Sequence, residues 1–223
     1  AVVGARAYYV IFQWDHYKDN LGDIFKIWEG GLAIYGGIIG GIIAAYFVCK
    51  KTGLRFIKLL DLAGMSLLIG QGIGRWGNFT NQEAFGTNTT LPWGMTSDKI
   101  SAYINSNQAE FTQNGFEMNP DLPVHPTFLY ESLWCLLGFV ILYIVCQKFY
   151  KFDGQLFLGY GIIYGIERTI VEGLRTDSLY IGNTTLRASQ VLSLAIVVVC
   201  TAITVYKFIQ LKKSKPAEVQ ENV

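Results

Sequence analysis

Long uncharged stretches alternate with shorter polar segments along this chain. Residues Gly30 to Cys49 run for twenty positions without a charged side chain, and Ala188 to Tyr206 run for nineteen. At about 1.5 Å per helical residue, each stretch is long enough to cross a hydrocarbon core of roughly 30 Å. The pattern therefore predicts an all-α protein that crosses a membrane several times.

The same alternation predicts six membrane helices, of which the first is incomplete. A polar segment rich in Asn, Thr, Gln and Pro, Gly77–Val124, separates the third helix from the fourth. The charged end of the chain, residues 212–223, is expected to be a disordered tail, which leaves residues 1–211 as one membrane-embedded domain. The predicted helices are Ala1–Trp14, Gly30–Cys49, Phe56–Trp76, His125–Val145, Gly154–Glu172 and Ala188–Ile209.

Basic residues fall on one side of the predicted helices when successive helices alternate in direction. Because short cytoplasmic loops are enriched in Lys and Arg, this side and the C-terminus are expected to be cytoplasmic. The polar segment Gly77–Val124 would then be extracytoplasmic, with Arg75, Glu172 and Arg175 near the outer face. The basic residues on the inner side are Lys50, Lys51, Arg55, Lys148, Lys151, Lys207, Lys212, Lys213 and Lys215.

The composition excludes several classes of function. Charged residues make up only 16% of the chain, whereas soluble domains carry about 25%. The net charge of +1 says nothing about nucleic acid, but the sequence shows no basic tract interleaved with aromatic residues, so no nucleic-acid partner is expected. Two histidines are too few for a His-rich metal centre, and the four cysteines, all in or beside apolar stretches, are expected to fill space. Neither a cofactor nor a signal peptide is expected.

Polar side chains gather at the end of the third predicted helix, within the stretch Gly70–Gly86. A glycine-rich apolar run is followed within nine positions by Arg75, Asn78, Asn81 and Glu83. An ionisable residue at the end of a membrane helix is costly, which favours a functional role. The alternative is an ordinary helix end, with Arg75 extended to water and a polar loop behind it.

A second polar group lies in the fifth predicted helix. Arg168, Glu172 and Arg175 are spaced i, i+4, i+7, so they lie along one face of that helix. Such a stripe either forms a structural ion-pair ladder or offers guanidinium groups to a phosphate, which accepts two parallel hydrogen bonds. In the second case Glu172 would keep the arginines oriented while no ligand is bound.

Four blocks of sequence carry a resemblance to a known family. Residues Gly74–Gly86 read G-R-x-G-N-F-x-N-x-E-x-x-G, and Tyr164–Arg175 read Y-G-x-x-R-x-x-V-E-x-x-R. A glycine-rich block occupies Glu29–Gly40, and His125–Glu131 read H-P-x-x-L-Y-E. Together the blocks resemble the prolipoprotein diacylglyceryl transferases, and the resemblance extends over nearly the whole chain.

The resemblance implies a reaction and a set of residues. Members of this family move the diacylglyceryl group of phosphatidylglycerol to the thiol of the lipobox cysteine in a bacterial prolipoprotein, and they release glycerol phosphate. They lie in the bacterial cell membrane and usually have seven membrane helices, so the resemblance implies one helix before Ala1. The catalytic residues implied are Tyr35, Arg75, Glu83, Arg168, Glu172 and Arg175. Those implied for binding phosphatidylglycerol are Arg6, Arg75, Asn78, Gly86, Glu131 and Arg175.

Tyr35 departs from the family pattern, because many relatives carry histidine there. A histidine could accept the thiol proton at neutral pH, whereas an ordinary tyrosine, with a pKa of about 10, could not. Tyr35 could be a phenolate stabilised by arginines, a hydrogen-bond donor to the phosphate, or a packing ring. The donor is favoured, since a hydroxyl and an imidazole N–H can share that role. The general base would then be Glu83, Glu172 or no single residue.

Two other classes of function compete with the transferase. A secondary transporter of an anionic substrate would also bury Arg and Glu among glycine-broken helices. It would show similar breaks in both halves, whereas the breaks here lie mostly in the first half. A non-catalytic scaffold would explain the small-residue pairs Gly36/Gly40 and Gly37/Gly41. It would leave the charged residues gathered toward one face unexplained.

Overall fold

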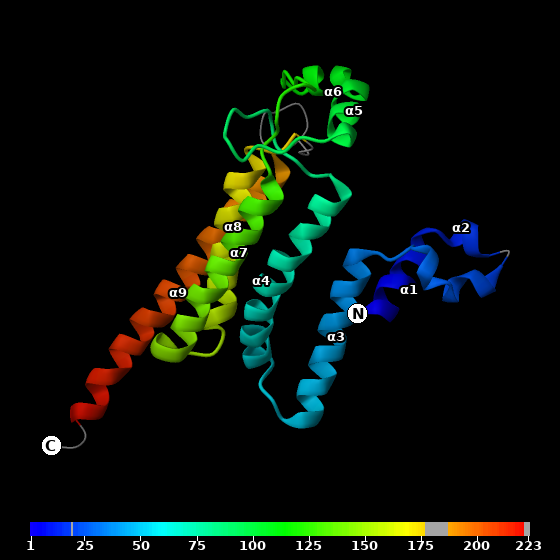
Figure 1. Cartoon of the computed structure of the whole chain (residues 1–223). Helices are drawn as coiled ribbons and strands as arrows, with labels where there is room; N and C mark the ends of the chain where they lie inside the picture. The colour runs from blue at the N-terminus through cyan, green and yellow to red at the C-terminus, as the bar shows by residue number, and fades with distance from the viewer. Residues whose placement is uncertain (19, 177–186, 221–223) are drawn as a thin grey trace. The chain divides into compact units, whose positions relative to one another are not determined.

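The computed structural model describes residues 1–18, 20–176 and 187–220, without the side chains of 29 and 214–220. Every regular element within these residues is helical, as predicted, and the β pairing there consists of isolated bridges. The chain divides into two compact units, Ala1–Leu59 and Leu60–Val223, and each is described by itself (Figure 1). The single domain expected over 1–211 and the tail expected at 212–223 stay predictions.

Close approach of glycines holds the first unit together. It contains helices α1 (Val2–Phe12), α2 (Trp14–Tyr17) and α3 (Ile34–Thr52), with the short 3₁₀ turns η1 (Leu21–Phe25) and η2 (Ile27–Glu29). A Cβ on Gly40 would lie 3.1 Å from the Cα of Gly4, and a Cβ on Gly36 would meet the backbone of α1. The predicted pair Gly36/Gly40 therefore packs α3 against α1.

Helix α3 begins at Ile34, four residues later than predicted. Gly30 and Gly31 have φ angles of +92° and +74°, a left-handed conformation that side chains rarely adopt. These two residues therefore turn the chain before the helix can start. The guanidinium of Arg6 holds this turn by donating to its backbone carbonyls.

Within the described residues, four helices are long and apolar enough to cross a membrane. They are α3, α4 (Phe56–Asn81), α7 (Thr127–Ile144) continued by the π-helical turn η3 (Val145–Phe149), and residues Ala188–Lys213 of α9 (Ala188–Gln220). Helix α1 is too short, and the eighteen residues of α8 (Gln155–Glu172) include Glu167, Arg168 and Glu172. Length and composition thus support a polytopic membrane protein, and the count of six spans stays a prediction.

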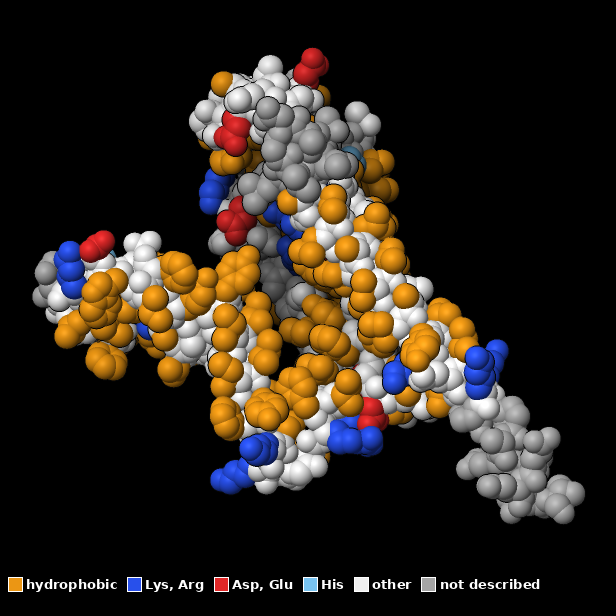
Figure 2. Space-filling model, turned by 180° about the vertical axis from the view of Figure 1, so that it is seen from behind, with side chains coloured by type: hydrophobic (Ala, Val, Ile, Leu, Met, Phe, Trp, Pro, Cys, Tyr) orange, Lys and Arg blue, Asp and Glu red, His pale blue; other side chains and the backbone are white. Residues whose placement is uncertain are grey.

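Helices α4, α7, α8 and α9 belong to the second unit, apart from the first residues of α4. Gly64 of α4 approaches the Phe157 backbone of α8, and Gly165 of α8 approaches the Ser193 carbonyl of α9, so both contacts exclude larger side chains. Hydrophobic side chains line the exposed length of α9, with lysine side chains toward its C-terminal end (Figure 2). Such a surface suits contact with lipid.

Asp61 of α4 caps the start of α8. Its carboxylate, 4% exposed, accepts hydrogen bonds from the backbone N–H groups of Gly154 (2.7 Å), Leu156 (2.8 Å) and Phe157 (2.9 Å). A helix leaves its first N–H groups without partners, and a negative charge at that end is favourable. The Tyr150 hydroxyl donates a fourth bond, at 2.9 Å. Burial and this bond raise the pKa of Tyr150, which keeps its hydroxyl protonated.

Replacing Asp61 by asparagine is expected to destabilise the protein by about 1–3 kcal/mol, because the amide offers one acceptor oxygen and turns an N–H₂ group toward other donors. The midpoint of thermal unfolding in detergent should fall accordingly. Asp121→Asn is the matched control, since Asp121 is exposed in the polar segment. Equal midpoints for the two variants would contradict a capping role for Asp61.

The polar segment between α4 and α7 builds a core of its own. Helices α5 (Asp98–Ser106) and α6 (Gln108–Gln113) lie here, and the Ser97 hydroxyl caps α5 by accepting from the N–H of Ile100 at 3.2 Å. We call this region the cap. Its buried residues are Phe85, Ile100, Ile104, Phe111, Met118 and Val124. Because helix α4 continues to Asn81, past the predicted end at Trp76, Asn78 lies on a helix rather than in a loop.

Candidate active site

A buried cluster of ion pairs joins helices α4, α7 and α8. Glu131 of α7, 1% exposed, lies 3.1 Å from Nη1 of Arg75 on α4 and 3.7 Å from Nη1 of Arg168 on α8. Arg168 also pairs with Glu172, one turn further along α8, at 2.9 Å. Three helices thus contribute charged groups to one place, and Glu131 lies at its centre.

Small residues allow these helices to approach closely enough. A Cβ on Gly72 would lie 3.4 Å from both the Ser132 carbonyl and the Cβ of Cys135, so α4 and α7 touch backbone to backbone just below the ion pairs. The Trp76 indole donates to the Ser132 hydroxyl at 3.2 Å, which fixes the same two helices. The glycine-rich end of α4 therefore positions Arg75 against Glu131.

The cluster presents partly accessible guanidinium groups, and the buried carboxylates of Glu131, Glu167 and Glu172 formally balance their charge. Buried carboxylates need paired cations, and Glu131 lies within electrostatic range of three arginines, Arg75, Arg168 and Arg175. The side chains of Arg75 and Arg168 are each 21% exposed, so their guanidinium groups are accessible in part. Guanidinium groups held in this way are pre-oriented for a phosphate.

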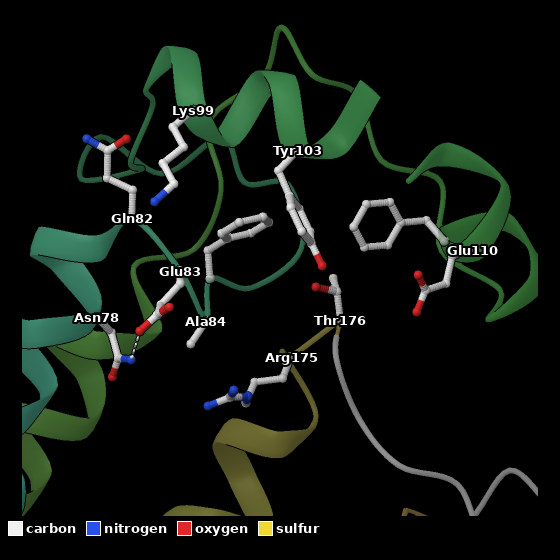
Figure 3. A pocket seen from close by; sticks show the side chains of 11 residues that line it. Asn78, Gln82, Glu83, Ala84, Lys99, Tyr103, Glu110, Arg175 and Thr176 are labelled. Carbon is white, nitrogen blue, oxygen red and sulfur yellow. Dashed lines mark hydrogen bonds between the residues drawn. The ribbon is translucent and has the colours of Figure 1, made fainter. Parts of the chain in front are cut away.

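A pocket of about 560 Å³ lies beside the cluster, between the end of α4, the cap and the chain after α8 (Figure 3). Arg175 points into it toward the side of Asn78 and Glu83. Asn78 donates a hydrogen bond to the Glu83 carboxylate at 3.2 Å, and Asn81 donates a second at 3.1 Å. The lining residues are Asn78, Gln82, Glu83, Ala84, Phe85, Lys99, Tyr103, Glu110, Phe111, Arg175 and Thr176.

The backbone around Glu83 is strained. Gln82 and Ala84, on either side of it, have φ angles of +53° and +55°, which non-glycine residues seldom adopt. Such conformations cost on the order of 1–3 kcal/mol each and cluster at functional sites. This double turn directs the Glu83 carboxylate back over the end of α4, where both asparagines reach it.

Gly86 lies behind the pocket rather than in its lining. It pairs with Arg175 in an isolated antiparallel bridge, and its N–H donates to the His125 carbonyl at 2.9 Å. A Cβ here would meet the side chain of His125 at 2.8 Å and the carbonyl of Leu174 at 3.0 Å. Glycine therefore lets the chain that carries Arg175 come close, and a direct role in binding a lipid stays a prediction.

His125 lies next to this bridge, outside the candidate membrane spans. Its Nδ1 lies 3.1 Å from the hydroxyl of Tyr130, which accepts a hydrogen bond from the Trp93 indole at 2.9 Å. Burial lowers the pKa of His125, so its ring is neutral near pH 7. The ring thus takes part in a neutral hydrogen-bonded group that ties the cap to α7.

The structure assembles most of the predicted site residues in two adjoining groups. Arg75, Glu131, Arg168 and Glu172 form the ion pairs, whereas Asn78, Glu83 and Arg175 line the pocket. Tyr35 and Arg6 belong to the first unit, Ala1–Leu59. Tyr35 is 71% exposed, and its ring centroid lies 6.5 Å from that of Tyr8.

The guanidinium of Arg6 binds the backbone of the turn that precedes α3. A guanidinium has five N–H donors, and the five of Arg6 point at five backbone carbonyls, at 2.6 to 3.3 Å. A Cβ on Gly31 would also collide with its guanidinium. This geometry supports a structural role in holding residues 23–31, and its predicted role in lipid binding stays a prediction.

Sequence reasoning missed Glu167 and the cap residues of the pocket. Glu167 is 2% exposed, and neither carboxylate oxygen has a hydrogen-bond partner among the described residues. The available signal was a second acidic residue, besides Glu172, in an apolar helix. Lys99, Tyr103 and Glu110 gave no such signal, because their segment has an ordinary polar composition. No group of three or more His, Cys, Asp or Glu within the described part of the chain is placed to hold a metal ion.

Comparisons with known proteins place these residues in a family context. The family model described as prolipoprotein diacylglyceryl transferase matches residues 1–206. A protein of Finegoldia magna named phosphatidylglycerol–prolipoprotein diacylglyceryl transferase is 52% identical over 198 residues, which cover 89% of this chain and 70% of the relative. A Listeria monocytogenes protein of the same name is 43% identical over 221 residues, covering 99% of this chain and 74% of the relative.

Proposed function

The chain belongs to the prolipoprotein diacylglyceryl transferase family, and from this premise we propose how its residues transfer a diacylglyceryl group from phosphatidylglycerol to a prolipoprotein. The observation that carries the proposal is the ion-pair cluster of Arg75, Glu131 and Arg168 beside a pocket that contains Arg175. Nothing in the comparisons supports the transporter alternative, since the relatives named above are transferases.

The reaction replaces one bond to a glycerol carbon with another. The thiol of the acceptor cysteine loses its proton, and its sulfur attacks the glycerol carbon that carries the phosphodiester oxygen. A C–S bond forms, the C–O bond breaks, and glycerol phosphate leaves with the electron pair of that bond. The leaving phosphate gains negative charge, so fixed cations beside it stabilise the transition state.

Arg75 and Arg175 hold the donor phosphate in this proposal. Each can offer two parallel N–H bonds to phosphate oxygens, and Glu131 keeps Arg75 in place from the side away from the ligand. Asn78 and Glu83 shape the adjoining pocket wall. The same positive groups favour the thiolate over the thiol, whose ordinary pKa of about 8.5 is otherwise too high at neutral pH.

Purified protein incubated with labelled phosphatidylglycerol and a peptide that contains a lipobox cysteine tests the function. The expected result is labelled peptide joined through a thioether, together with released glycerol phosphate. A peptide with serine in place of the cysteine is the matched control and should stay unlabelled. Recovery of the lipid unchanged beside an unmodified cysteine peptide would contradict the proposal.

The resemblance to the family supports the proposal that Tyr35 donates a hydrogen bond to the phosphate. Tyr35→His should keep most of the activity, because an imidazole N–H can also donate, and Tyr35→Phe should lose much of it. Neither change should move the acid limb of the pH–rate profile. A limb that shifts toward the pKa of histidine in Tyr35→His would show that this position accepts the proton, which contradicts the donor role.

The orientation proposed here places the cap outside the cell and the Lys50 and Lys148 turns inside, on the basis of the basic loops. It includes six membrane helices in this chain, α1 and α8 among them. Single cysteines at Asn107 of the cap and at Lys151, in a background without other cysteines, should differ in reaction with an impermeant reagent. Asn107→Cys is expected to react from outside, and equal labelling of Lys151→Cys would refute the orientation.

A further inference from the structure

One wall of the pocket has no part in the transfer as proposed. It is formed by Lys99 and Tyr103 of α5 and by Glu110 of α6 (Figure 3). Lys99 and Tyr103 are four residues apart and therefore share a helix face, whereas Ile100 and Ile104 are buried in the core of the cap. Helix α5 thus turns a charged and aromatic edge toward the pocket, and we call these three residues the cap wall.

Tyr103 is held rigidly and presents its hydroxyl group to the pocket. Its ring packs edge-on against Phe85 at 5.8 Å and against Phe111 at 6.2 Å between centroids. The residue is still 49% exposed, and its hydroxyl has no hydrogen-bond partner among the described residues. In Figure 3 this hydroxyl lies toward Thr176, across the pocket from its helix. A fixed aromatic ring with an open hydroxyl is typical of residues that anchor a bound polypeptide.

The pocket carries charges of both signs. Arg175 and Lys99 supply two cations, and Glu83 and Glu110 supply two carboxylates. The Lys99 ammonium donates to the Asn81 carbonyl at the end of α4, at 2.7 Å. At the cap wall an anionic headgroup would meet the Glu110 carboxylate unfavourably, whereas a neutral peptide backbone can donate to that carboxylate and accept from Lys99.

The position of the cap wall also favours a polypeptide. The cap lies in the segment between α4 and α7, beyond the helices that are long and apolar enough to cross a membrane. The acyl chains of the donor must stay in the hydrocarbon region, but the acceptor continues past its cysteine as an ordinary polypeptide. The cap wall and Arg175, one of the two arginines proposed to hold the phosphate, line the same pocket, so the donor phosphate and the residues after the acceptor cysteine can be bound there at once.

We propose that Lys99, Tyr103 and Glu110 bind the acceptor prolipoprotein over the residues that directly follow its modified cysteine. This inference rests on the proposed function, and it assigns to the cap a specificity-determining role in the same reaction. Tyr103 supplies the main contact through its ring and hydroxyl, and Glu110 and Lys99 bind backbone N–H and C=O groups on either side.

Two acceptor peptides that differ only after the cysteine test this assignment. One ends at the cysteine as an amide, and the other continues for four small residues. With the unaltered protein, kcat/KM for thioether formation should be about tenfold higher for the longer peptide, as expected for one aromatic anchor. In Tyr103→Ala this advantage should fall below about twofold, while kcat/KM for the short peptide and KM for phosphatidylglycerol stay the same. Tyr103→Phe separates the hydroxyl from the ring and should keep an intermediate advantage.

Glu110→Gln should reduce the advantage of the longer peptide, whereas the matched control Glu117→Gln, an exposed carboxylate of the cap outside the pocket, should not. Equal rates for both peptides with the unaltered protein would overturn the proposal. So would an equal loss for both peptides in Tyr103→Ala, or a rise in KM for the lipid. If the unaltered protein forms thioether product with neither the short nor the long peptide, the proposed function itself is contradicted.

Discussion

Replacing Arg75 by alanine is expected to lower the rate of diacylglyceryl transfer by about 10²–10³, the usual loss when a group that stabilises developing charge is removed. The guanidinium of Arg75 lies 3.1 Å from the Glu131 carboxylate, and the Arg75 side chain remains partly accessible. The protein should still fold, because Arg168 stays within ion-pair distance of Glu131 at 3.7 Å. The measurement is the initial rate of thioether formation, with thermal unfolding recorded in parallel.

Two further variants make this result specific. Arg75→Lys keeps the charge but loses the planar fork, so most of the activity should still be lost. Lys58→Ala removes an exposed cation from the other end of α4 and should leave the rate unchanged. Full activity in Arg75→Lys would show that the site needs only a nearby positive charge, and the two-point contact with phosphate would then be wrong.

Replacing Glu131 by glutamine is expected to have the largest effect on stability. The change leaves Arg75 and Arg168 close together without the carboxylate that separates their charges. Loss of one partner from a buried pair costs about 3–5 kcal/mol, and about 3 kcal/mol is expected here because both arginines partly reach the surface. The free energy of unfolding in detergent measures this loss, and Glu117→Gln in the cap is the control.

A second substitution distinguishes a lost ion pair from a packing defect. In the double variant Glu131→Gln and Arg75→Gln, the cation that loses its carboxylate partner is also removed, so part of the lost stability should return. If the losses of the two single variants simply added, the residues would act independently, and the central position of Glu131 would be without energetic consequence.

Much of the helical framework could be predicted from apolar periodicity, but the helix ends could not. The predicted end of α4 at Trp76 assumed that a polar run leaves the membrane as a loop. Asn78 and Asn81 instead continue the helix, because hydrogen bonds to Glu83 satisfy their amide groups and the backbone turns only at Gln82. The late start of α3 likewise follows from two glycines with positive φ, which hydrophobicity does not reveal.

The candidate site was predictable where spacing alone decides it. Arg168 and Glu172 are four residues apart on one helix, and the structure pairs them. Their meeting with Glu131 depends on the closeness of α4, α7 and α8, which glycines permit but sequence spacing does not encode. The cap wall was out of reach for another reason. Tyr103 is notable only because Phe85 and Phe111 fix its ring, and those contacts are tertiary.

The hydrogen bonds of Asp61 to the N-terminus of α8 fix how far α4 and α8 are shifted along their axes relative to each other. Arg75 stands fourteen residues after Asp61 on α4, and Arg168 stands thirteen residues after Gln155, where the capped helix begins. At about 1.5 Å of rise per residue, both arginines lie about 20 Å along their helices from the contact between Asp61 and the start of α8. Helices are stiff along their axes. The contact of Asp61 with α8 at one end of these helices therefore fixes the height along α4 and α8 at which Arg75 and Arg168 face Glu131 at the other end. One residue inserted into α4 between Asp61 and Arg75, or into α8 before Arg168, would shift one arginine by about 1.5 Å relative to the other and turn it by about 100° around the helix axis. One residue inserted into both α4 and α8 would bring the two arginines back to the same height relative to each other, but both side chains would still point in a different direction.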